Sequence, residues 1–220
     1  MKKKSPLPPK LPKSLENINI SSLEDYDEFT ESKIIACDLS EQEAKNLLIE
    51  ESYLQRVTLT SAKLPKLQLR DVRLENCDIS VAVLERCRFR RVEFISCRLL
   101  GVQMLSAEMD DVLFKDCNLE GAVFLSTKAK HIRFEKCQLQ NATFEGAELE
   151  NITFDRCDLS QSDFRNVKFK NADLRGSTLG GMQIEAKAVK GIVISAEQAI
   201  QMVSLLGVVV QDDGDFDQDF

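Results

Sequence analysis

Seven cysteines are the residues whose type and spacing most readily suggest chemistry in this 220-residue chain. They recur at intervals of ten, twenty or forty residues, at Cys37, Cys77, Cys87, Cys97, Cys117, Cys137 and Cys157. Structural metal sites usually pair cysteines about two to four residues apart, and no such pair occurs here. The same class of positions otherwise holds Ala and Val. We therefore expect buried, unpaired thiols that fill the core, with no metal and no cofactor.

The sequence offers few residues that could act in acid–base or nucleophilic catalysis. His131 is the one histidine, and its surroundings suggest no paired nucleophile and base. The sequence contains no glycine-rich phosphate loop, nucleophile elbow or acidic metal cluster. We therefore predict that the protein is not an enzyme and has no catalytic residues.

The composition favours a folded protein with a sizeable core. Hydrophobic residues make up 43% of the chain and charged residues 30%. No apolar run approaches the roughly 18 residues of a membrane span, and the Lys- and Pro-rich start does not resemble a signal peptide. We expect a cytoplasmic protein that makes no contact with membranes.

The net charge of −7 is concentrated at the two ends of the chain. Residues 50–194 carry 22 Lys and Arg against 21 Asp and Glu, whereas residues 195–220 carry six acidic residues and no basic ones. The middle of the chain has no basic stripe and no aromatic platform, so direct binding of nucleic acid is disfavoured.

A period of five governs the middle of the chain. Every fifth residue from Leu54 to Ile194 is apolar, at all 29 positions, which neither the helical period nor strand alternation explains. The residue two places earlier is usually small or β-branched, and the residue two places later is often Gly or Asn. Each unit of five therefore supplies two inward side chains and one corner that tolerates a positive φ.

A second period of twenty lies on top of the first. Phenylalanines repeat at this interval in two series, Phe94, Phe114, Phe134, Phe154 and Phe124, Phe144, Phe164. Four units then make one turn of a square coil, and like residues stack on successive coils. With coils about 4.8 Å apart, residues 50–194 make about seven coils in a rod of roughly 35 Å.

The five-residue units resemble the repeat of the pentapeptide-repeat family, whose consensus is a small residue, Asp or Asn, Leu or Phe, a polar residue, and Gly or Asn. The matching units include 122–126 (AVFLS), 142–146 (ATFEG), 157–161 (CDLSQ), 162–166 (SDFRN) and 172–176 (ADLRG). The resemblance covers about residues 52–194, and weaker units reach back to Cys37. It implies an all-β, right-handed quadrilateral β-helix, and it implies little about function because the family is functionally diverse.

The pattern divides the chain into five segments. Residues 1–13, with five Lys and four Pro, are predicted to be a disordered or polyproline-like leader, and residues 14–51 a cap with irregular first coils. Residues 52–194 form the regular β-helix. Residues 195–210 form a C-terminal capping α-helix with a short extension, and residues 211–220 a disordered acidic tail.

The predicted C-terminal helix has apolar residues at helical spacing. Covering the last coil is the expected role, and a homodimer contact is the alternative. The residues available for either role are Ala199, Ile200, Met202, Val203, Leu205 and Leu206.

One side of the predicted coil carries outward charges whose sign alternates from coil to coil. The set comprises Arg88, Arg90, Arg91, then Glu108, Asp110, Asp111, then Lys128, Lys130, His131, then Glu148, Glu150, then Lys168, Lys170. Opposite charges one coil apart favour a lattice of ion pairs that fixes the register.

Apolar residues also occur at predicted outward positions, where a partner protein or a second copy would find them. The predicted interaction patch comprises Val83, Leu105, Val123 and Leu125 on one side, with Leu100 and Leu113 on adjoining sides.

Two functions compete at this point. The first is a non-enzymatic structural or protein-interaction scaffold with an unidentified protein partner. The alternative is a DNA mimic that modulates a type II topoisomerase, since some members of the family protect gyrase and confer quinolone resistance. A mimic needs an acidic rod, so the near-neutral repeat region favours the scaffold.

Overall fold

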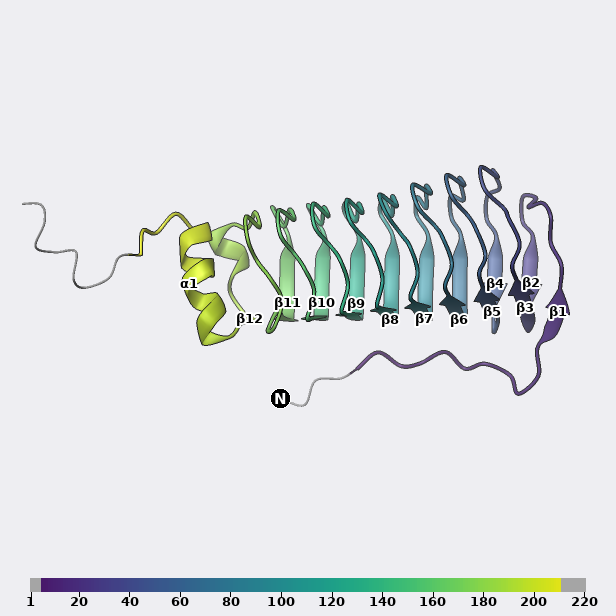
Figure 1. Cartoon of the computed structure of the whole chain (residues 1–220), viewed down its shortest axis with the longest axis horizontal. Coiled ribbons are helices and arrows are strands. Elements are labelled where there is room, and N and C mark those ends of the chain that lie inside the picture. The colour runs from purple at the N-terminus through teal and green to yellow at the C-terminus, as the bar shows by residue number, and fades with distance from the viewer. Residues whose placement is uncertain (1–4, 211–220) are drawn as a thin grey trace, which may run out of the picture.

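Short parallel strands stack side by side into a long rod of about nine turns, with helix α1 at its C-terminal end (Figure 1). The computed structural model describes residues 5–210. The chain advances by one turn every twenty residues, so each residue lies beside the residues twenty before and twenty after it. We call such a row of residues a column. This is the all-β solenoid that the two periods predict.

The described residues form strands of two lengths and two helices at the C-terminal end. The short strands are β1 (Glu16–Ile18), β2 (Glu28–Thr30), β3 (Ser32–Ile35), β4 (Leu48–Glu50), β5 (Tyr53–Gln55) and β12 (Ile192–Val193). The long strands are β6 (Gln68–Glu75), β7 (Arg88–Ile95), β8 (Glu108–Lys115), β9 (Lys128–Glu135), β10 (Glu148–Asp155) and β11 (Lys168–Asp173). The helices are a short 3-10 helix, η1 (Ala186–Ala188), and α1 (Ala196–Leu205).

Each regular turn has four sides, and the strands cover two of them. In the turn that begins with β6, the strand bends at Asp71, which has a φ of 55°, and so lines two sides. The other two sides are joined to the next turn by single bridges, at Asp78 and at Val83.

The corners lie five residues apart and adopt the left-handed backbone conformation. Glycine and asparagine occupy many of them, as the sequence predicts, yet Arg91 (φ 52°) and even the β-branched Val81 (φ 55°) adopt it as well. A β-branched residue with a positive φ is strained. Buried apolar residues on both sides of each corner hold the backbone in place, so the corner residue need not favour the turn by itself.

Stacked phenylalanines fill the centre of the rod. Phe94, Phe114, Phe134 and Phe154 stack with centroids 4.7, 4.8 and 5.1 Å apart and rings within 6° of parallel. A second stack of Phe124, Phe144 and Phe164 has centroid distances of 4.8 and 4.7 Å. The two stacks meet edge to face, which is a favourable arrangement of aromatic quadrupoles.

The seven cysteines are free, and six of them are buried. The Cys97 and Cys117 thiols each donate to a backbone carbonyl of the preceding turn, at 3.5 and 3.3 Å. Ser177 continues the same column, and its hydroxyl donates to the carbonyl of Phe154 at 3.1 Å. Burial raises the pKa of the Cys87 thiol to about 12. The thiols therefore act as core residues that also satisfy turn carbonyls.

The N-terminal end differs from the sequence prediction in two ways. The twenty-residue register begins before residue 52, because Phe29 already lies beside Ile49 and Ile34 beside Leu54. Residues 5–12, predicted to be a disordered or polyproline-like leader with no contact to the coils, lie along the rod beside the strands (Figure 1). Their backbone amides find carboxylate acceptors on the coils, and no periodic side-chain pattern would reveal such bonds.

Helix α1 closes the C-terminal end. Ser195 and Gln198 form a capping box at its start. The Gln198 side-chain amide also donates to the carbonyls of Leu174 and Ser177, each at 2.7 Å, which satisfies acceptors at the end of the last coils. Among residues 5–210, no helix is long and apolar enough to cross a membrane. The predicted acidic tail, residues 211–220, lies outside the described residues.

Candidate interaction surfaces

Strands β7 to β11 carry the predicted charged side as two columns of alternating sign. One column is Arg88, Glu108, Lys128, Glu148 and Lys168, and the other is Arg90, Asp110, Lys130, Glu150 and Lys170. We call these ten residues the lattice face. Between the columns lies a shallow groove whose floor is formed by Phe89, Met109, Ala129, Leu149 and Phe169. Strand alternation explains this arrangement, because each floor residue points inward and its two neighbours point outward.

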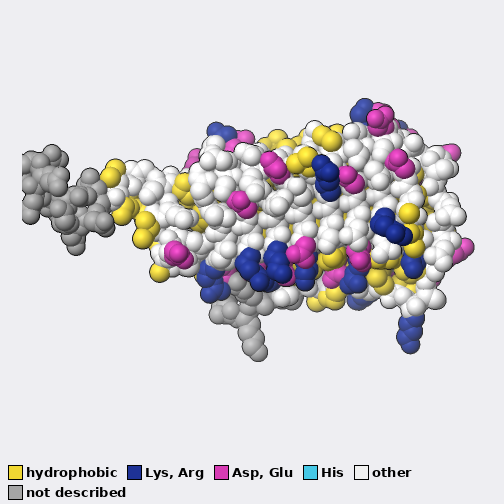
Figure 2. Space-filling view, in the orientation of Figure 1, with side chains coloured by type: hydrophobic (Ala, Val, Ile, Leu, Met, Phe, Trp, Pro, Cys, Tyr) yellow, Lys and Arg dark blue, Asp and Glu magenta, His cyan; other side chains and the backbone are white. Residues whose placement is uncertain are grey.

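Ion pairs connect neighbours on the lattice face. They are Arg88–Glu108 at 3.2 Å, Glu148–Lys168 at 2.8 Å and Glu150–Lys170 at 2.8 Å. The hydrogen bond from Lys168 lowers the pKa of Glu148, and the one from Lys170 lowers the pKa of Glu150. These side chains are mostly exposed, so each pair contributes little to stability. Basic and acidic side chains are interleaved along the lower edge of the rod in Figure 2 rather than gathered into one block.

Arg91, Asp111 and His131 lie at the adjacent corner and not on the lattice face. Together with Asp71 they form a separate column, which we call the corner ladder. Arg91 holds the Asp71 carboxylate through both of its oxygens, with Nε to Oδ1 at 2.5 Å. The Arg91 side chain is 13% exposed and that of Asp71 is 4% exposed. The corner ladder is therefore far more buried than the lattice face beside it.

The corner ladder also binds the N-terminal segment, residues 5–12. Asp71 accepts the Lys10 amide N–H at 2.9 Å, and Asp111 accepts the Leu7 amide N–H at 3.0 Å. Burial alone would raise the pKa of Asp71. The hydrogen bonds from Arg91 and from the Lys10 amide outweigh that effect, so its pKa lies below the ordinary value.

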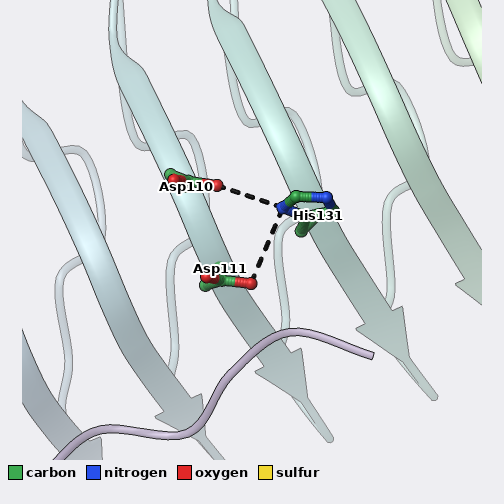
Figure 3. Close-up of side chains that lie close together, drawn as sticks. All are labelled: Asp110, Asp111 and His131. Carbon is green, nitrogen blue, oxygen red and sulfur yellow. Dashed lines mark hydrogen bonds and ion pairs between the residues drawn. The ribbon is translucent and has the colours of Figure 1, made fainter. Parts of the chain in front are cut away.

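Figure 3 shows Asp110 and Asp111 on β8 pointing toward His131 on β9. His131 Nδ1 lies 3.2 Å from Asp110 Oδ1 and 3.7 Å from Asp111 Oδ1. One ligand atom from each of the three residues lies within 4.8 Å of the others, close enough to hold a metal ion. The predicted coil already placed His131 one coil from Asp110 and Asp111 in the alternating charge set, but the sequence did not predict that the three could share a metal ion.

The predicted apolar patch does not form one continuous surface. Val83, Leu105, Val123 and Leu125 share a side, and Leu100 lies on the adjoining side. The prediction that Leu113 lies on an adjoining side is wrong. Leu113 is on β8, ten residues from Val123, and ten residues correspond to two of the four sides. Leu113 therefore lies on the side opposite Val83, Leu105, Val123 and Leu125. Leu125, at 38%, is the most exposed of the six, and the others are half-buried.

The C-terminal end carries most of the exposed large hydrophobic side chains among residues 5–210. Of the ten large hydrophobic side chains that are exposed among residues 5–210, six lie at this end, at Val193, Ile200, Leu206, Val208, Val209 and Val210. Met202 packs onto the last coils, and Ala199, Val203 and Leu205 are half-buried. Figure 2 shows hydrophobic side chains gathered around this end of the rod.

Known proteins resemble this chain in its repeat and in its fold. A family model described as the pentapeptide repeat region matches residues 47–124 and 87–164. No curated protein matches the chain. Among solved structures, full-length QnrB1, a plasmid-mediated fluoroquinolone resistance protein, is 19% identical with a TM-score of 0.52, over 88% of this chain and 100% of that one. HetL, involved in heterocyst differentiation regulation in the cyanobacterium Nostoc sp. strain PCC 7120, is 17% identical with a TM-score of 0.38, over 80% and 86%.

At these identities the likeness to QnrB1 concerns the fold alone. The two family matches together span residues 47–164, more than half of the chain. The same span contains the apolar centres, the left-handed corners and the stacked phenylalanines described above. This chain therefore belongs to the pentapeptide-repeat family.

Proposed function

We propose that the protein is a non-enzymatic interaction scaffold whose C-terminal end associates with a second copy of the chain. The observation that carries this proposal is the apolar surface on and beyond helix α1. Ile200 is 60% exposed, and Val208, Val209 and Val210 are 55%, 80% and 52% exposed. Apolar side chains gathered in this way on a protein surface mark a contact with another protein.

The chemistry of this end supports a second copy as the partner. Residues 195–210 contain a single charged residue, Glu197. Two such ends can meet about a two-fold axis with little repulsion between like charges, and the same patch on each copy covers the other. Gln198 and Met202 pack onto the coils, so the opposite face of α1, which includes Ile200, is free for the contact.

The charges of the lattice face support a scaffold over a DNA mimic. A mimic of duplex DNA presents one sign of charge at phosphate-like spacing. The columns from Arg88 to Lys168 and from Arg90 to Lys170 instead alternate in sign at each turn. A gyrase supercoiling assay with the full-length protein tests the alternative, and the proposal expects no protection of gyrase from a quinolone.

The mass of the full-length protein in solution tests self-association. Sedimentation equilibrium is run on the wild type, on Ile200→Asp with Val209→Asp, and on the control Tyr26→Asp. Tyr26 is 66% exposed at the opposite end of the rod, so this control adds one exposed negative charge away from α1, against two in the double variant. We expect a dimer for the wild type and the control, and a monomer for the double variant. A wild-type monomer, or a dimer that survives the double substitution, contradicts the proposal.

A further inference from the structure

The N-terminal segment contacts the corner ladder in a regular way. Four of its eight residues are proline, and these cannot donate a backbone hydrogen bond. Pro6, Pro9 and Pro12 are half-buried against the rod, whereas Leu7 and Lys10, which follow two of them, expose their side chains. The Leu7 and Lys10 amides are the groups that bond to Asp111 and Asp71. The contact thus repeats every three residues.

A three-residue repeat is the period of the polyproline II helix. Three residues of that helix advance about 9 Å along its axis. Asp71 and Asp111 are two turns of the coil apart, and two spacings of about 4.8 Å make about 9.6 Å. The proline-rich segment and the corner ladder therefore have matching repeats, so successive amide donors meet successive carboxylates.

The corner ladder is chemically suited to this ligand. Arg91 lies between the two carboxylates in the column and binds Asp71, which keeps the Asp71 carboxylate ionised and in place. Asp71 is 3% exposed and Asp111 is 8% exposed. The N-terminal segment passes close to Asp111 (Figure 3) and bonds to both carboxylates. Recognition uses backbone amides and proline rings, because the Leu7 side chain is 48% exposed and contributes little burial.

We propose that the corner ladder is a recognition site for proline-rich segments, and that residues 5–12 are its resident ligand. The ligand pattern is Pro-x-x-Pro, with a free amide directly after each of these prolines. A tethered ligand acts at an effective concentration on the order of millimolar, so an outside segment of the same pattern has to compete with the N-terminal segment. This site lies on the side of the rod and is independent of the proposed self-association at α1.

Proline substitutions test the proposal because they remove an amide donor and keep the segment proline-rich. The test variant is the full-length protein with Leu7→Pro and Lys10→Pro. The matched control is Leu11→Pro, since the Leu11 amide has no hydrogen-bond acceptor among the described residues. Circular dichroism confirms that both variants retain the β-helix, whose coils these changes do not touch.

The readout is the fluorescence anisotropy of a labelled synthetic peptide with the sequence of residues 1–13. We expect the peptide to bind the double variant at least about tenfold more tightly than the wild type or the Leu11→Pro control, because only the double variant has lost its resident ligand. A peptide that carries both prolines should bind none of them. Equal affinity for the three proteins, or no binding to any, overturns the proposal.

Hydrogen exchange of the wild type, followed by NMR, tests occupancy by the resident segment. We expect the Leu7 and Lys10 amides to exchange at least about tenfold more slowly than the Leu11 amide. In Asp111→Gly, which removes the acceptor at a corner whose positive φ glycine tolerates, exchange at Leu7 should accelerate while exchange at Lys10 stays slow. Equal exchange at the three amides of the wild type overturns the proposal.

Discussion

The inside of the rod and its surface use the same twenty-residue register in opposite ways. Inside the rod, residues of the same type stack on one another. Phe134 stacks between Phe114 and Phe154 with rings within 6° of parallel. On the lattice face and the corner ladder, neighbouring coils carry opposite charges, as in the Glu148–Lys168 pair. The coil places every residue beside the residue twenty positions later. Each side chain in a column therefore contacts the side chains at the equivalent position in the neighbouring turns.

This difference follows from what each kind of contact does at about 4.8 Å. Aromatic rings attract one another at this separation, and identical rings fit the same slot in each turn. Like charges repel at this separation, so alternating signs or neutral residues stabilise a surface column. Where like charges do meet, as at Glu135 and Asp155, a cation such as Arg133 binds both of them. The composition of a column therefore distinguishes inside from outside, and substitutions in each type of column test this rule.

The largest effect is expected from a break in an interior column. Phe134→Ala removes a ring that stacks on two neighbours and meets Phe124 and Phe144 edge to face. We expect a loss of about 3–5 kcal/mol in the free energy of unfolding, measured with urea. Phe169→Ala is the control, because Phe169 is half-buried at the end of the aromatic core and should cost clearly less. Equal losses would mean that stacking inside the rod adds nothing.

The second largest loss of stability is expected from a substitution in the corner ladder, whose side chains are largely buried. The same kind of substitution on the exposed lattice face should cost much less. Asp71→Asn leaves the Arg91 guanidinium without its charged partner at a site where both side chains are largely buried. We expect a loss of about 2 kcal/mol in urea unfolding, the range for hydrogen bonds to charged groups. Glu148→Gln, which breaks an exposed pair, should cost less than about 1 kcal/mol. If the two variants lose the same stability, burial does not distinguish the corner ladder from the lattice face.

Acid should weaken the corner ladder through the same carboxylate. The pKa of Asp71 is lower in the folded protein than its ordinary value of 3.8, while Arg91 and Arg70, whose own pKa values are raised, stay protonated. Its contribution is therefore complete above that value and is lost as the pH falls through the lower, folded pKa. Between about pH 5 and pH 2, the urea midpoint should fall less in Asp71→Asn than in the wild type. The other acidic groups titrate in both proteins, so equal falls contradict the prediction.

The sequence predicted the interior well, because each inward slot repeats many times and tolerates few residue types. It predicted less about contacts that occur once. The Gln198 bonds to the last coils and the Leu7 bond to Asp111 join residues that share no period, and the latter uses a backbone amide. The His131–Asp110 contact depends on the coil register together with a one-residue offset. Leu113 was predicted on a side adjoining the apolar patch, but two corners separate it from the side of Val123. The side that a residue occupies depends on the number of corners between it and the reference residue.

A smaller effect is expected when a charge is reversed on the exposed face. Glu108→Lys places a positive charge directly between Arg88 and Lys128, its neighbours in the column. We expect a loss of up to about 1 kcal/mol, seen as a lower melting temperature at low salt and a smaller difference at high salt. Glu108→Gln, which removes the attraction without adding repulsion, should lie between the two. A melting temperature equal to that of the wild type would show that alternation on this face is not needed for stability.

The smallest effect is expected in the cysteine column. Substitutions at Cys117 test whether its thiol stabilises the core by its apolar volume or by its hydrogen bonds. Cys117 donates to the carbonyls of Phe94 and Lys115, each at 3.3 Å, and Ser177 makes the equivalent bond further along the column. If the bonds matter, Cys117→Ser should retain more stability than Cys117→Ala, by about 0.5 kcal/mol in urea unfolding. The reverse order would show that only the apolar volume of the thiol is used. Because the hydroxyl at Ser177 already occupies this environment, we expect serine to be the better substitute.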